Sequence, residues 1–505
     1  MSQVAVKESG KRTEVKTYKN YIGGRWVESK SGRTFNSLNP AHKTEVLGVM
    51  QASNAQDVDA AITAAQKAFA DWRRTPAPAR GEIALKAGIL LEERKEDLAR
   101  MMTQEMGKVL KEARGDVQEA IDMAKYAAGM GRRPYGETVP SELKNKWAMT
   151  RREPLGVVGC ITPWNFPMAI PSWKIFPALM GGNTVVFKPA SDTPIMAVKL
   201  VEILEEAGLP GGVLNLVTGS AAEAGDPIVK DPRVSGISFT GSTQAGKQIA
   251  EYCGRTLKRV ALELGGKNCI VVLEDADIPL AVDGALWAAF GTSGQRCTAA
   301  SRLIVDRKVE ADFVDLLQER TAKMKVGDGL LPDTDMGPVI NEASLKKVHE
   351  YTEIGKKEHA RLVHGGEFAG EGGWFYRPTI FADGRKEMRM AQEEIFGPST
   401  LVMPVSNLEE ALEVANSTQY GLSMSIYTND LKRAFHAMEE MQSGIVYVNA
   451  PTIGAEIQLP FGGVKSTGNG HREAGTVALD EFTEWKTIYV DYSGRLQRAQ
   501  IDTGE

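Results

Sequence analysis

Cysteine and histidine, the residues that build disulfide frameworks and many metal sites, are scarce in this sequence. Its 505 residues include four cysteines and six histidines. Cys160, Cys253, Cys269 and Cys297 form no Cys-x-x-Cys pair, and the scattered histidines have no metal-ligand spacing. We therefore expect no disulfide framework and no bound metal ion, and we expect a cytoplasmic protein in a reducing compartment.

Long apolar runs and an excess of one charge are also missing. No segment approaches the roughly 20 apolar residues of a membrane helix, and residues 1–16 lack the apolar core of a signal peptide. The net charge is −5, with acidic and basic residues interspersed. These absences argue against membrane and nucleic-acid partners and favour a small-molecule substrate. We expect residues 1–16 to form a flexible tail.

The chain is long enough for two or three domains, because single cores stop growing near about 250–300 residues. Apolar residues at helical spacing predict helices over 57–72 and 79–132. From Gly156 onward, apolar strands alternate with helices, which predicts an α/β fold with a parallel sheet covered on both faces. The expected strands are 157–161, 184–187, 213–217, 237–240 and 260–262. A second α/β unit is expected after residue 297, with strands at 302–305, 401–404 and 444–449 and helices at 309–324 and 407–415.

Two segments with strand propensity, 147–153 and 487–491, stand apart from this alternation. Short strands far apart in the chain are compatible with a sheet exchanged between subunits. They are equally compatible with a plain surface hairpin, and composition leaves both alternatives open.

Candidate catalytic residues follow the ends of predicted strands, where parallel sheets bind ligands. The segment 262–267, Leu-Glu-Leu-Gly-Gly-Lys, carries a candidate general base, Glu263, and the segment 294–297, Gly-Gln-Arg-Cys, carries a candidate thiol nucleophile, Cys297. The neighbouring cation Arg296 favours the thiolate form of that cysteine. We expect the other three cysteines to be small buried residues.

A glycine-containing turn at 239–247 allows two interpretations. Gly241-x4-Gly246-Lys247 nearly matches the P-loop of a phosphate-transfer enzyme, but Gln248 stands where the Mg²⁺-binding Ser or Thr belongs. As a strand-to-helix turn, the same segment offers backbone N–H groups to the pyrophosphate of a dinucleotide. The usual Gly-x-Gly-x-x-Gly is absent, so the turn alone decides little.

The segments 262–267 and 294–297, with Glu263 and Cys297 34 positions apart, resemble the aldehyde dehydrogenase superfamily. The resemblance extends from Asn39-Pro-Ala to the Pro-Phe-Gly-Gly turn at 460–463. It implies the aldehyde dehydrogenase fold, with a Rossmann-like cofactor domain, an α/β catalytic domain and a small β extension for oligomerisation. The implied boundaries are 17–133 and 153–265 for the cofactor-binding domain, 266–470 for the catalytic domain, and 134–152 and 482–495 for the oligomerisation strands. An exchanged sheet, and thus a homodimer or homotetramer, is favoured by the same resemblance.

The resemblance also implies NAD(P)-dependent oxidation of an aldehyde to the free acid. Cys297 is expected to attack the aldehyde, forming a thiohemiacetal and then a thioester. Asn165 and the Cys297 backbone N–H match the oxyanion donors, and Lys174 matches a lysine that supports the site. Glu263 would activate the water that cleaves the thioester. Family members that transfer the acyl group to coenzyme A lack this glutamate.

The cofactor implied by the resemblance is NADP or NAD. Ser191 replaces a glutamate that would bond the adenosine ribose, so a 2′-phosphate would have room beside Lys188. Glu394 is expected to hold the nicotinamide ribose, with Phe396 against the ring. The full set of expected cofactor residues is Ile161, Pro163, Trp164, Lys188, Ser191, Gly241, Ser242, Gly246, Glu394 and Phe396.

The expected substrate residues are Arg296, Thr298, Ile453 and Phe461. The segments 74–78, 171–174 and 449–459 resemble the α-ketoglutaric semialdehyde (2,5-dioxopentanoate) dehydrogenases. This favours a small semialdehyde with a carboxylate that Arg296 would bind, although an arginine turned away from the site is equally compatible with the motif. Dehydrogenases for succinic, aminoadipic, aromatic or general aldehydes remain alternatives. So does a non-catalytic structural protein on this fold.

Overall fold

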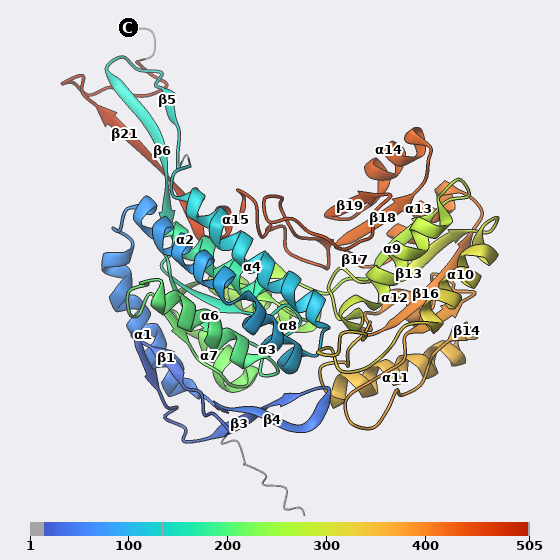
Figure 1. The fold of residues 1–505 in the computed structure, drawn as a ribbon. Helices are drawn as coiled ribbons and strands as arrows, with labels where there is room; N and C mark the ends of the chain where they lie inside the picture. The colour runs from blue at the N-terminus through green and yellow to red at the C-terminus, as the bar shows by residue number, and fades with distance from the viewer. Residues whose placement is uncertain (1–14, 134, 503–505) are drawn as a thin grey trace, which may run out of the picture.

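A computed structural model describes residues 15–133 and 135–502 (Figure 1), so 1–14 of the predicted tail lie outside the described residues. One half of the body is built on a seven-stranded sheet of order β11-β10-β7-β8-β9-β1-β2. The five expected strands are confirmed as its parallel part, and two short antiparallel strands extend one edge. Their bounds are β7 (Val157–Ile161), β8 (Thr184–Lys188), β9 (Leu214–Leu216), β10 (Val234–Thr240), β11 (Arg259–Glu263), β1 (Asn20–Ile22) and β2 (Arg25–Val27).

Helices cover both faces of this sheet, as the run of apolar strands predicts. One face packs against α2, α3, α4, α5 and α6, and the other face packs against α1, α7 and α8. The bounds are α1 (Ala55–Trp72), α2 (Ala77–Glu93), α3 (Lys95–Met106), α4 (Leu110–Met130), α5 (Ala169–Gly181), α6 (Pro194–Glu206), α7 (Asp226–Lys230) and α8 (Thr243–Thr256).

The other half of the body holds a second seven-stranded sheet of order β14-β15-β16-β13-β12-β18-β19. The strands β12, β14, β15 and β18 were not among the expected ones, although β12, β15 and β18 are fully buried. The strands are β12 (Asn268–Val272), β13 (Ala300–Asp306), β14 (Arg361–His364), β15 (Thr379–Ala382), β16 (Ser399–Val405), β18 (Ser423–Tyr427) and β19 (Ile445–Val448). Its main helices are α9 (Ile278–Phe290), α10 (Glu310–Ala322), α11 (Glu342–Lys357), α13 (Leu408–Asn416) and α14 (Leu431–Glu440).

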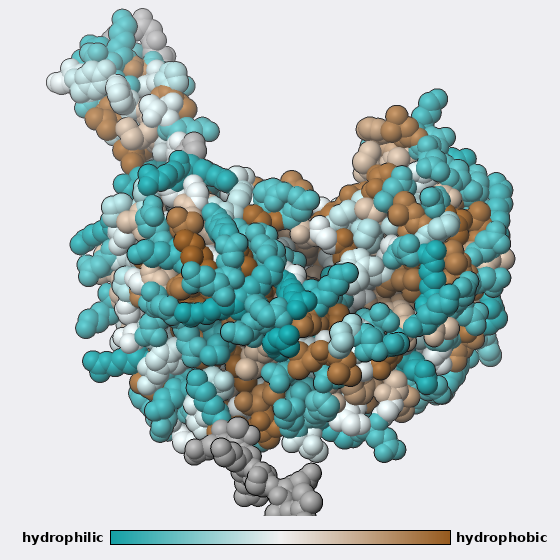
Figure 2. Space-filling model, in the orientation of Figure 1, coloured by the Kyte–Doolittle hydropathy of each residue, from teal (hydrophilic) through white to brown (hydrophobic). Residues whose placement is uncertain are grey.

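The two isolated strand segments pair with each other within the chain. β6 (Lys146–Pro154) lies between β21 (Thr483–Asp491) and β5 (Thr138–Pro140) in an antiparallel sheet, with Trp147 opposite Val490. Figure 1 shows this sheet projecting from the body as an arm. Large apolar and aromatic side chains are exposed on the arm and on α14, and Figure 2 shows hydrophobic patches on both.

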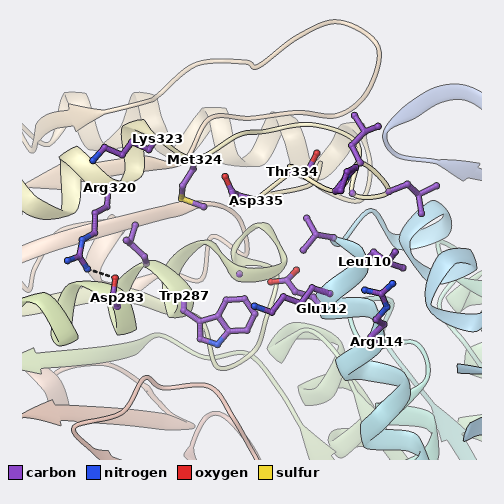
Figure 3. A pocket seen from close by; sticks show the side chains of 18 of the residues that line it. Leu110, Glu112, Arg114, Asp283, Trp287, Arg320, Lys323, Met324, Thr334 and Asp335 are labelled. Atoms are coloured by element: carbon purple, nitrogen blue, oxygen red, sulfur yellow. Dashed lines mark hydrogen bonds and ion pairs between the residues drawn. The ribbon is translucent and has the colours of Figure 1, made fainter. Parts of the chain in front are cut away.

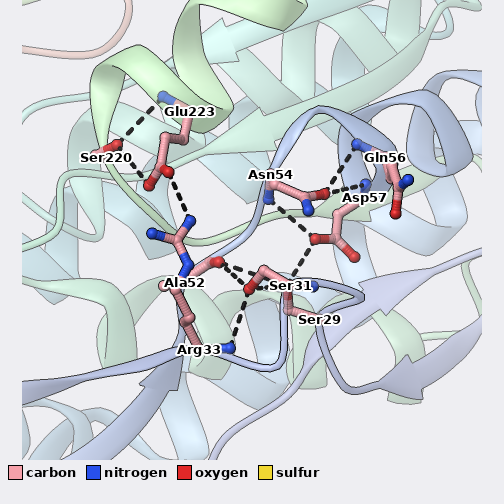
Figure 4. Close-up of polar contacts among 9 residues, drawn as sticks. All are labelled: Ser29, Ser31, Arg33, Ala52, Asn54, Gln56, Asp57, Ser220 and Glu223. Carbon is pink, nitrogen blue, oxygen red and sulfur yellow. Dashed lines mark hydrogen bonds and ion pairs between the residues drawn. The ribbon is translucent and has the colours of Figure 1, made fainter.

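A polar network joins α1 to the hairpin of β3 (Thr34–Asn39) and β4 (His42–Gln51) and to the short helix η1 (Ala221–Gly225) (Figure 4). Asn54 caps α1 by accepting from the N–H groups of Gln56 and Asp57. Asp57 in turn accepts from Ser29 Oγ at 2.6 Å. Arg33 pairs with Glu223 of η1 at 2.5 Å. The network fixes η1 beside the loop at 218–220.

Two features are absent from the described ranges, 15–133 and 135–502. No helix there is both long and apolar enough to cross a membrane. No group of three or more His, Cys, Asp or Glu side chains in these ranges is arranged to hold a metal ion.

Candidate active site

The candidate catalytic residues from the first sheet and the second converge on one buried pocket. Glu263 ends β11, and Cys297 follows the short helix η2 (Gly291–Gly294) that leaves α9. Both side chains line the pocket, as do all four expected substrate residues. Its wall includes Glu119, Glu263, Arg296, Cys297, Thr298, Ile453, Phe461 and Glu473.

Glu263 is a buried carboxylate without a partner. Its side chain is 4% exposed, and neither oxygen accepts a hydrogen bond within the described part of the chain. The backbone is fixed on both sides, because Glu263 O accepts from Gly241 N at 3.0 Å and Leu264 N donates to Thr467 O at 2.7 Å. Burial and the nearby Glu473 raise the pKa of Glu263 well above its usual value. The Glu263 carboxyl group therefore keeps its proton to a higher pH than a solvated glutamate, and it is a stronger base once it is ionised.

The Cys297 thiol lies where the substrate pocket meets a second cleft, and it lines both. Burial, followed by the carboxylates Glu263 and Glu394, raises its pKa to about 12. The expectation that Arg296 favours the thiolate is therefore wrong. The guanidinium of Arg296 is paired with Glu112 at 3.3 Å, while carboxylates face the thiol. The thiol must lose its proton to a base as it attacks.

Asn165 and Lys174 come from the segment that follows β7. Asn165 lines the second cleft next to Cys297, and Lys174 contacts Glu473 of the pocket wall from behind. Asn165 is 2% exposed and its Oδ1 atom has no partner among the described residues. Lys174, on α5, is fully buried and donates to Ser238 Oγ at 2.8 Å and to Glu473. Burial alone would lower the pKa of Lys174, but Glu473 and Glu481 offset this and leave it raised. Lys174 is therefore a buried cation behind the pocket and not a solvated helix lysine.

Two acidic residues of the pocket carried no sequence signal. Glu473 reaches the pocket wall and also accepts from Lys174, 299 positions away. Glu119, on α4, also lines the pocket, where burial and Asp116 raise its pKa to about 8. Below that pH Glu119 is predominantly neutral, so it does not repel a negatively charged substrate.

The second cleft, of about 220 Å³, is formed by the expected nicotinamide-side residues. Gly241 and Ser242 line it at the start of α8, where Ser242 Oγ caps the helix by accepting from Ala245 N. Gly246 does not line this cleft: it is buried, and a Cβ there would meet Leu264 Cδ1 at 2.9 Å. Its lack of a side chain lets α8 approach β11. The cleft is also lined by Pro163, Trp164, Asn165, Cys297, Ser344, Lys347, Glu394 and Phe396.

Glu394 and Phe396 lie on the far wall of that cleft. Glu394 Oε1 accepts from Gly266 N at 3.0 Å, and a Cβ at Gly265 would meet Glu394 Oε2 at 2.6 Å. The glycine pair thus makes room for the carboxylate. Phe396 packs edge-on against Trp164, with ring centroids 5.4 Å apart. Lys347 of α11 and its neighbour Ser344 were missed by the sequence analysis, since an exposed helix lysine has no distinguishing signal.

The expected adenosine-side residues lie at the ends of β7 and β8. Ile161 ends β7 and Lys188 ends β8, where the Lys188 ammonium donates to Pro189 O at 2.9 Å. Burial lowers the pKa of Lys188 to about 8. Ser191 Oγ donates to Gly219 O at 3.0 Å, next to the network around η1. A small neutral residue and a buried lysine at this edge fit a dinucleotide with or without a 2′-phosphate.

The remaining expected substrate residues form the apolar side of the pocket. Ile453 and Phe461 are buried, and Phe461 meets Trp173 edge-on at 5.1 Å between ring centroids. Thr298 O accepts from Thr452 Oγ1 at 2.7 Å. This bond attaches the catalytic loop, residues 292–298, to the loop at 449–459. The pocket therefore combines an apolar wall with Arg296 beside Cys297.

A half-buried thiol where two cavities meet, with an unpartnered carboxyl group in one of them, is compatible with the site that the sequence resemblance predicts. Residues 26–488 match the model of the aldehyde dehydrogenase family. The chain belongs to this family. It therefore catalyses the NAD(P)-dependent oxidation of an aldehyde, and the resemblance, the fold and the enzyme class predicted from the sequence are confirmed.

Similar proteins cover this dehydrogenase almost end to end. The α-ketoglutaric semialdehyde dehydrogenase of Bacillus subtilis (strain 168) is 42% identical over 482 residues, 95% of this chain and 99% of the relative. Retinaldehyde dehydrogenase 3 of Mus musculus is also 42% identical, over 94% of this chain and 93% of the relative. The aldehyde dehydrogenase of Bacillus cereus, solved as an NAD⁺ complex, superposes with a TM-score of 0.92 at 38% identity, covering 94% of this chain and 97% of that one.

Proposed function

We propose that this dehydrogenase oxidises a small semialdehyde with a distal carboxylate, and that α-ketoglutaric semialdehyde is its substrate. Three relatives named for this semialdehyde are 42%, 43% and 45% identical to the chain, and retinaldehyde dehydrogenase 3 is 42% identical. The observation that carries the proposal is Arg296, which lines the pocket next to the nucleophile. Its Nε and Nη2 groups are bonded to Thr292 and Glu112, which leaves the other guanidinium N–H groups for a carboxylate.

We infer that Cys297 is the nucleophile. As Sγ adds to the aldehyde carbon, the thiol proton passes to water and negative charge develops on the aldehyde oxygen. The Asn165 amide and the Cys297 N–H are the proposed donors to that oxygen. Bound NAD(P)⁺ supplies the acceptor for the hydride that leaves the thiohemiacetal carbon. Cys297 then holds the acyl group as a thioester.

Glu263 is the proposed base for hydrolysis of that thioester. Its two free oxygens and raised pKa suit it to take a proton from an attacking water. Water addition breaks the C–S bond and returns the free acid and the Cys297 thiol. The cations Lys174 and Arg472 lower the pKa of Glu263 and offset part of the rise that burial and Glu473 cause.

For the cofactor, we propose that Gly241, Ser242 and the start of α8 receive the pyrophosphate and that Glu394 holds the nicotinamide ribose. Lys188 and Ser191 would face the adenosine ribose. We further propose the domain division given by the resemblance: 17–133 and 153–265 for cofactor binding, 266–470 for catalysis, and 134–152 with 482–495 for subunit contacts.

Ser191→Glu is expected to remove the use of NADP. A carboxylate at this position would repel the 2′-phosphate and accept from both ribose hydroxyls of NAD, so kcat/KM for NADP should fall by about 100-fold while that for NAD is kept. Steady-state reduction of each cofactor measures this. Ser191→Ala, which loses only the bond to Gly219, is the control and should keep the wild-type ratio. An unchanged ratio in Ser191→Glu would remove Ser191 from the cofactor site.

α-Ketoglutaric semialdehyde is expected to exceed an uncharged aldehyde of equal length by about 100-fold in kcat/KM, which equals about 2.7 kcal/mol of transition-state binding. Arg296→Gln should bring the two aldehydes close to parity, because the substrate carboxylate loses its cation. The matched control is Arg114→Gln, an exposed arginine of α4 bonded to Glu96. If the wild-type enzyme uses both aldehydes alike, the semialdehyde assignment is withdrawn and a general aldehyde oxidiser takes its place.

We also propose that the dehydrogenase is a homodimer or homotetramer assembled through the arm. Large apolar side chains on the arm and along one side of α14 are exposed in the single chain, which is unfavourable unless a second copy covers them. They are Val139, Trp147, Trp485, Tyr489 and Val490 on the arm, and Leu431, Phe435 and Met438 on α14.

A further inference from the structure

The turn that precedes the nucleophile has an uncommon backbone. Thr292, Ser293 and Gly294 have φ values of 54°, 55° and 68°, so three consecutive residues are left-handed. Glycine adopts this conformation freely, but it is unfavourable for serine and more so for a β-branched threonine. Contacts outside the turn must therefore hold it.

Glu112 supplies the contacts at the first of these residues. Its Oε1 atom accepts from Thr292 N at 2.8 Å, and its Oε2 atom accepts from Thr292 Oγ1 at 3.3 Å. The same carboxylate meets Arg296 Nη2 at 3.3 Å, while Arg296 Nε donates to Thr292 Oγ1 at 2.9 Å. Glu112 is 7% exposed and lies in the first turn of α4, where the helix dipole favours a negative charge. One carboxylate thus fixes both ends of the segment 292–296.

The other side of the turn is held by a different part of the chain. Ser293 Oγ donates to Gly337 O at 2.7 Å, and Gln295 Oε1 accepts from Ile340 N at 2.9 Å. These bonds come from the half of the body that carries the nucleophile, whereas α4 packs with the helices over the first sheet. Glu112 therefore sets the position of the catalytic loop relative to the half that supplies Glu263 and Asn165.

Arg296 connects Glu112 to the pocket through its side-chain contacts. Its guanidinium lies between two aromatic rings, 4.8 Å from the Trp287 centroid and 5.3 Å from that of Phe166, which follows Asn165. On the side away from the pocket, Glu112 and Trp287 line a groove of about 960 Å³ (Figure 3). A shift of Glu112 would displace Arg296, Phe166 and the loop together.

We propose that Glu112 is a positioning residue for the nucleophile: it holds the left-handed turn at Thr292 and Ser293 so that Cys297 faces the aldehyde. The proposal rests on Cys297 being the nucleophile, as proposed above. It assigns Glu112 no contact with substrate or cofactor. Its function is to stabilise a backbone conformation that the sequence of the turn disfavours. It thereby keeps Cys297 in position relative to Glu263 and Asn165 from the other half of the body.

Glu112→Ala tests this in the full-length enzyme. The pre-steady-state burst of reduced cofactor should slow by about 100-fold, and alkylation of Cys297 by iodoacetamide should slow by roughly tenfold, because the thiol is displaced. Cofactor affinity, measured by titration, should stay at the wild-type value. Glu96→Ala, which removes an exposed carboxylate of α3, is the matched control. Wild-type burst and alkylation rates in Glu112→Ala would overturn the proposal.

A second substitution separates positioning from general destabilisation. Thr292→Gly, added to Glu112→Ala, should recover most of the burst rate, because glycine adopts the left-handed conformation without outside support. If the double variant is as slow as Glu112→Ala, the proposal is contradicted. Should Glu112→Ala fail to fold, Glu112→Gln keeps one acceptor for Thr292 N, and its smaller slowing must also be reversed by Thr292→Gly. A burst that survives in Cys297→Ser would instead refute the proposed nucleophile.

Discussion

Cys297→Ala is expected to lower aldehyde oxidation by at least about 10⁴-fold while leaving NAD(P) affinity unchanged, because the thiol is the atom that bonds to the substrate. The side chain lines both the substrate pocket and the cofactor cleft, but it is not a proposed ligand of the cofactor. Steady-state rates and an equilibrium titration with NAD⁺ and NADP⁺ measure the two effects.

Cys253→Ala is the control for that experiment. Cys253 is a buried thiol of α8, away from the pocket, and its loss should leave the rate within a small factor of wild type. Activity above about 1% in Cys297→Ala would show that another group attacks the aldehyde, and the proposed mechanism would then be abandoned.

Glu263→Gln is expected to separate the two chemical steps. Acylation should still release about one equivalent of reduced cofactor per active site, whereas turnover should fall by about 10²–10⁴-fold because no base activates the water. Rapid mixing followed by steady-state recording resolves the burst from the slow phase. In the wild-type enzyme, the rate of thioester hydrolysis should fall as the pH is lowered and Glu263 becomes protonated. This loss should occur at a higher pH than the titration of a solvated glutamate, since the pKa of Glu263 is raised.

The matched control is Glu251→Gln, an exposed carboxylate of α8 that pairs with Arg255. It should show wild-type turnover with no accumulation of acyl-enzyme. Normal turnover in Glu263→Gln would show that Glu263 is not the base for hydrolysis. Glu473, another carboxylate of the pocket wall, would then be the next candidate.

Local pattern was sufficient to predict the parallel strands of the first sheet, whereas the roles expected of Glu263 and Cys297 also depended on the family resemblance. Apolar strands of five to seven residues that alternate with helices have few other solutions than a covered parallel sheet. Residues just after such strands lie at one edge of the sheet. Asn165, Lys188, Gly241 and Glu263 were therefore expected near a ligand site at that edge. Strands such as β12 and β18 were not predicted, because a short apolar run without a flanking motif can belong to a strand or to a buried helix.

Sequence pattern could not predict which charges face each other. Arg296 was expected to assist its neighbour Cys297, but its guanidinium is bonded to Glu112, 184 positions away. Lys174 has the spacing of an ordinary helix residue, yet it is buried against Glu473 from the end of the chain. The raised pKa of the thiol follows from such long-range contacts, so it depends on the tertiary structure and not on the motif.

The most direct test of the account is to identify the acylated residue. Glu263→Gln enzyme mixed with α-ketoglutaric semialdehyde and NAD⁺, quenched in acid and digested, should yield one modified peptide, with the acyl group on Cys297. Mass spectrometry of the peptides that contain the four cysteines measures this. Acylation of Cys160, Cys253 or Cys269, or no acyl-enzyme during a burst of reduced cofactor, would contradict oxidation through a thioester on Cys297.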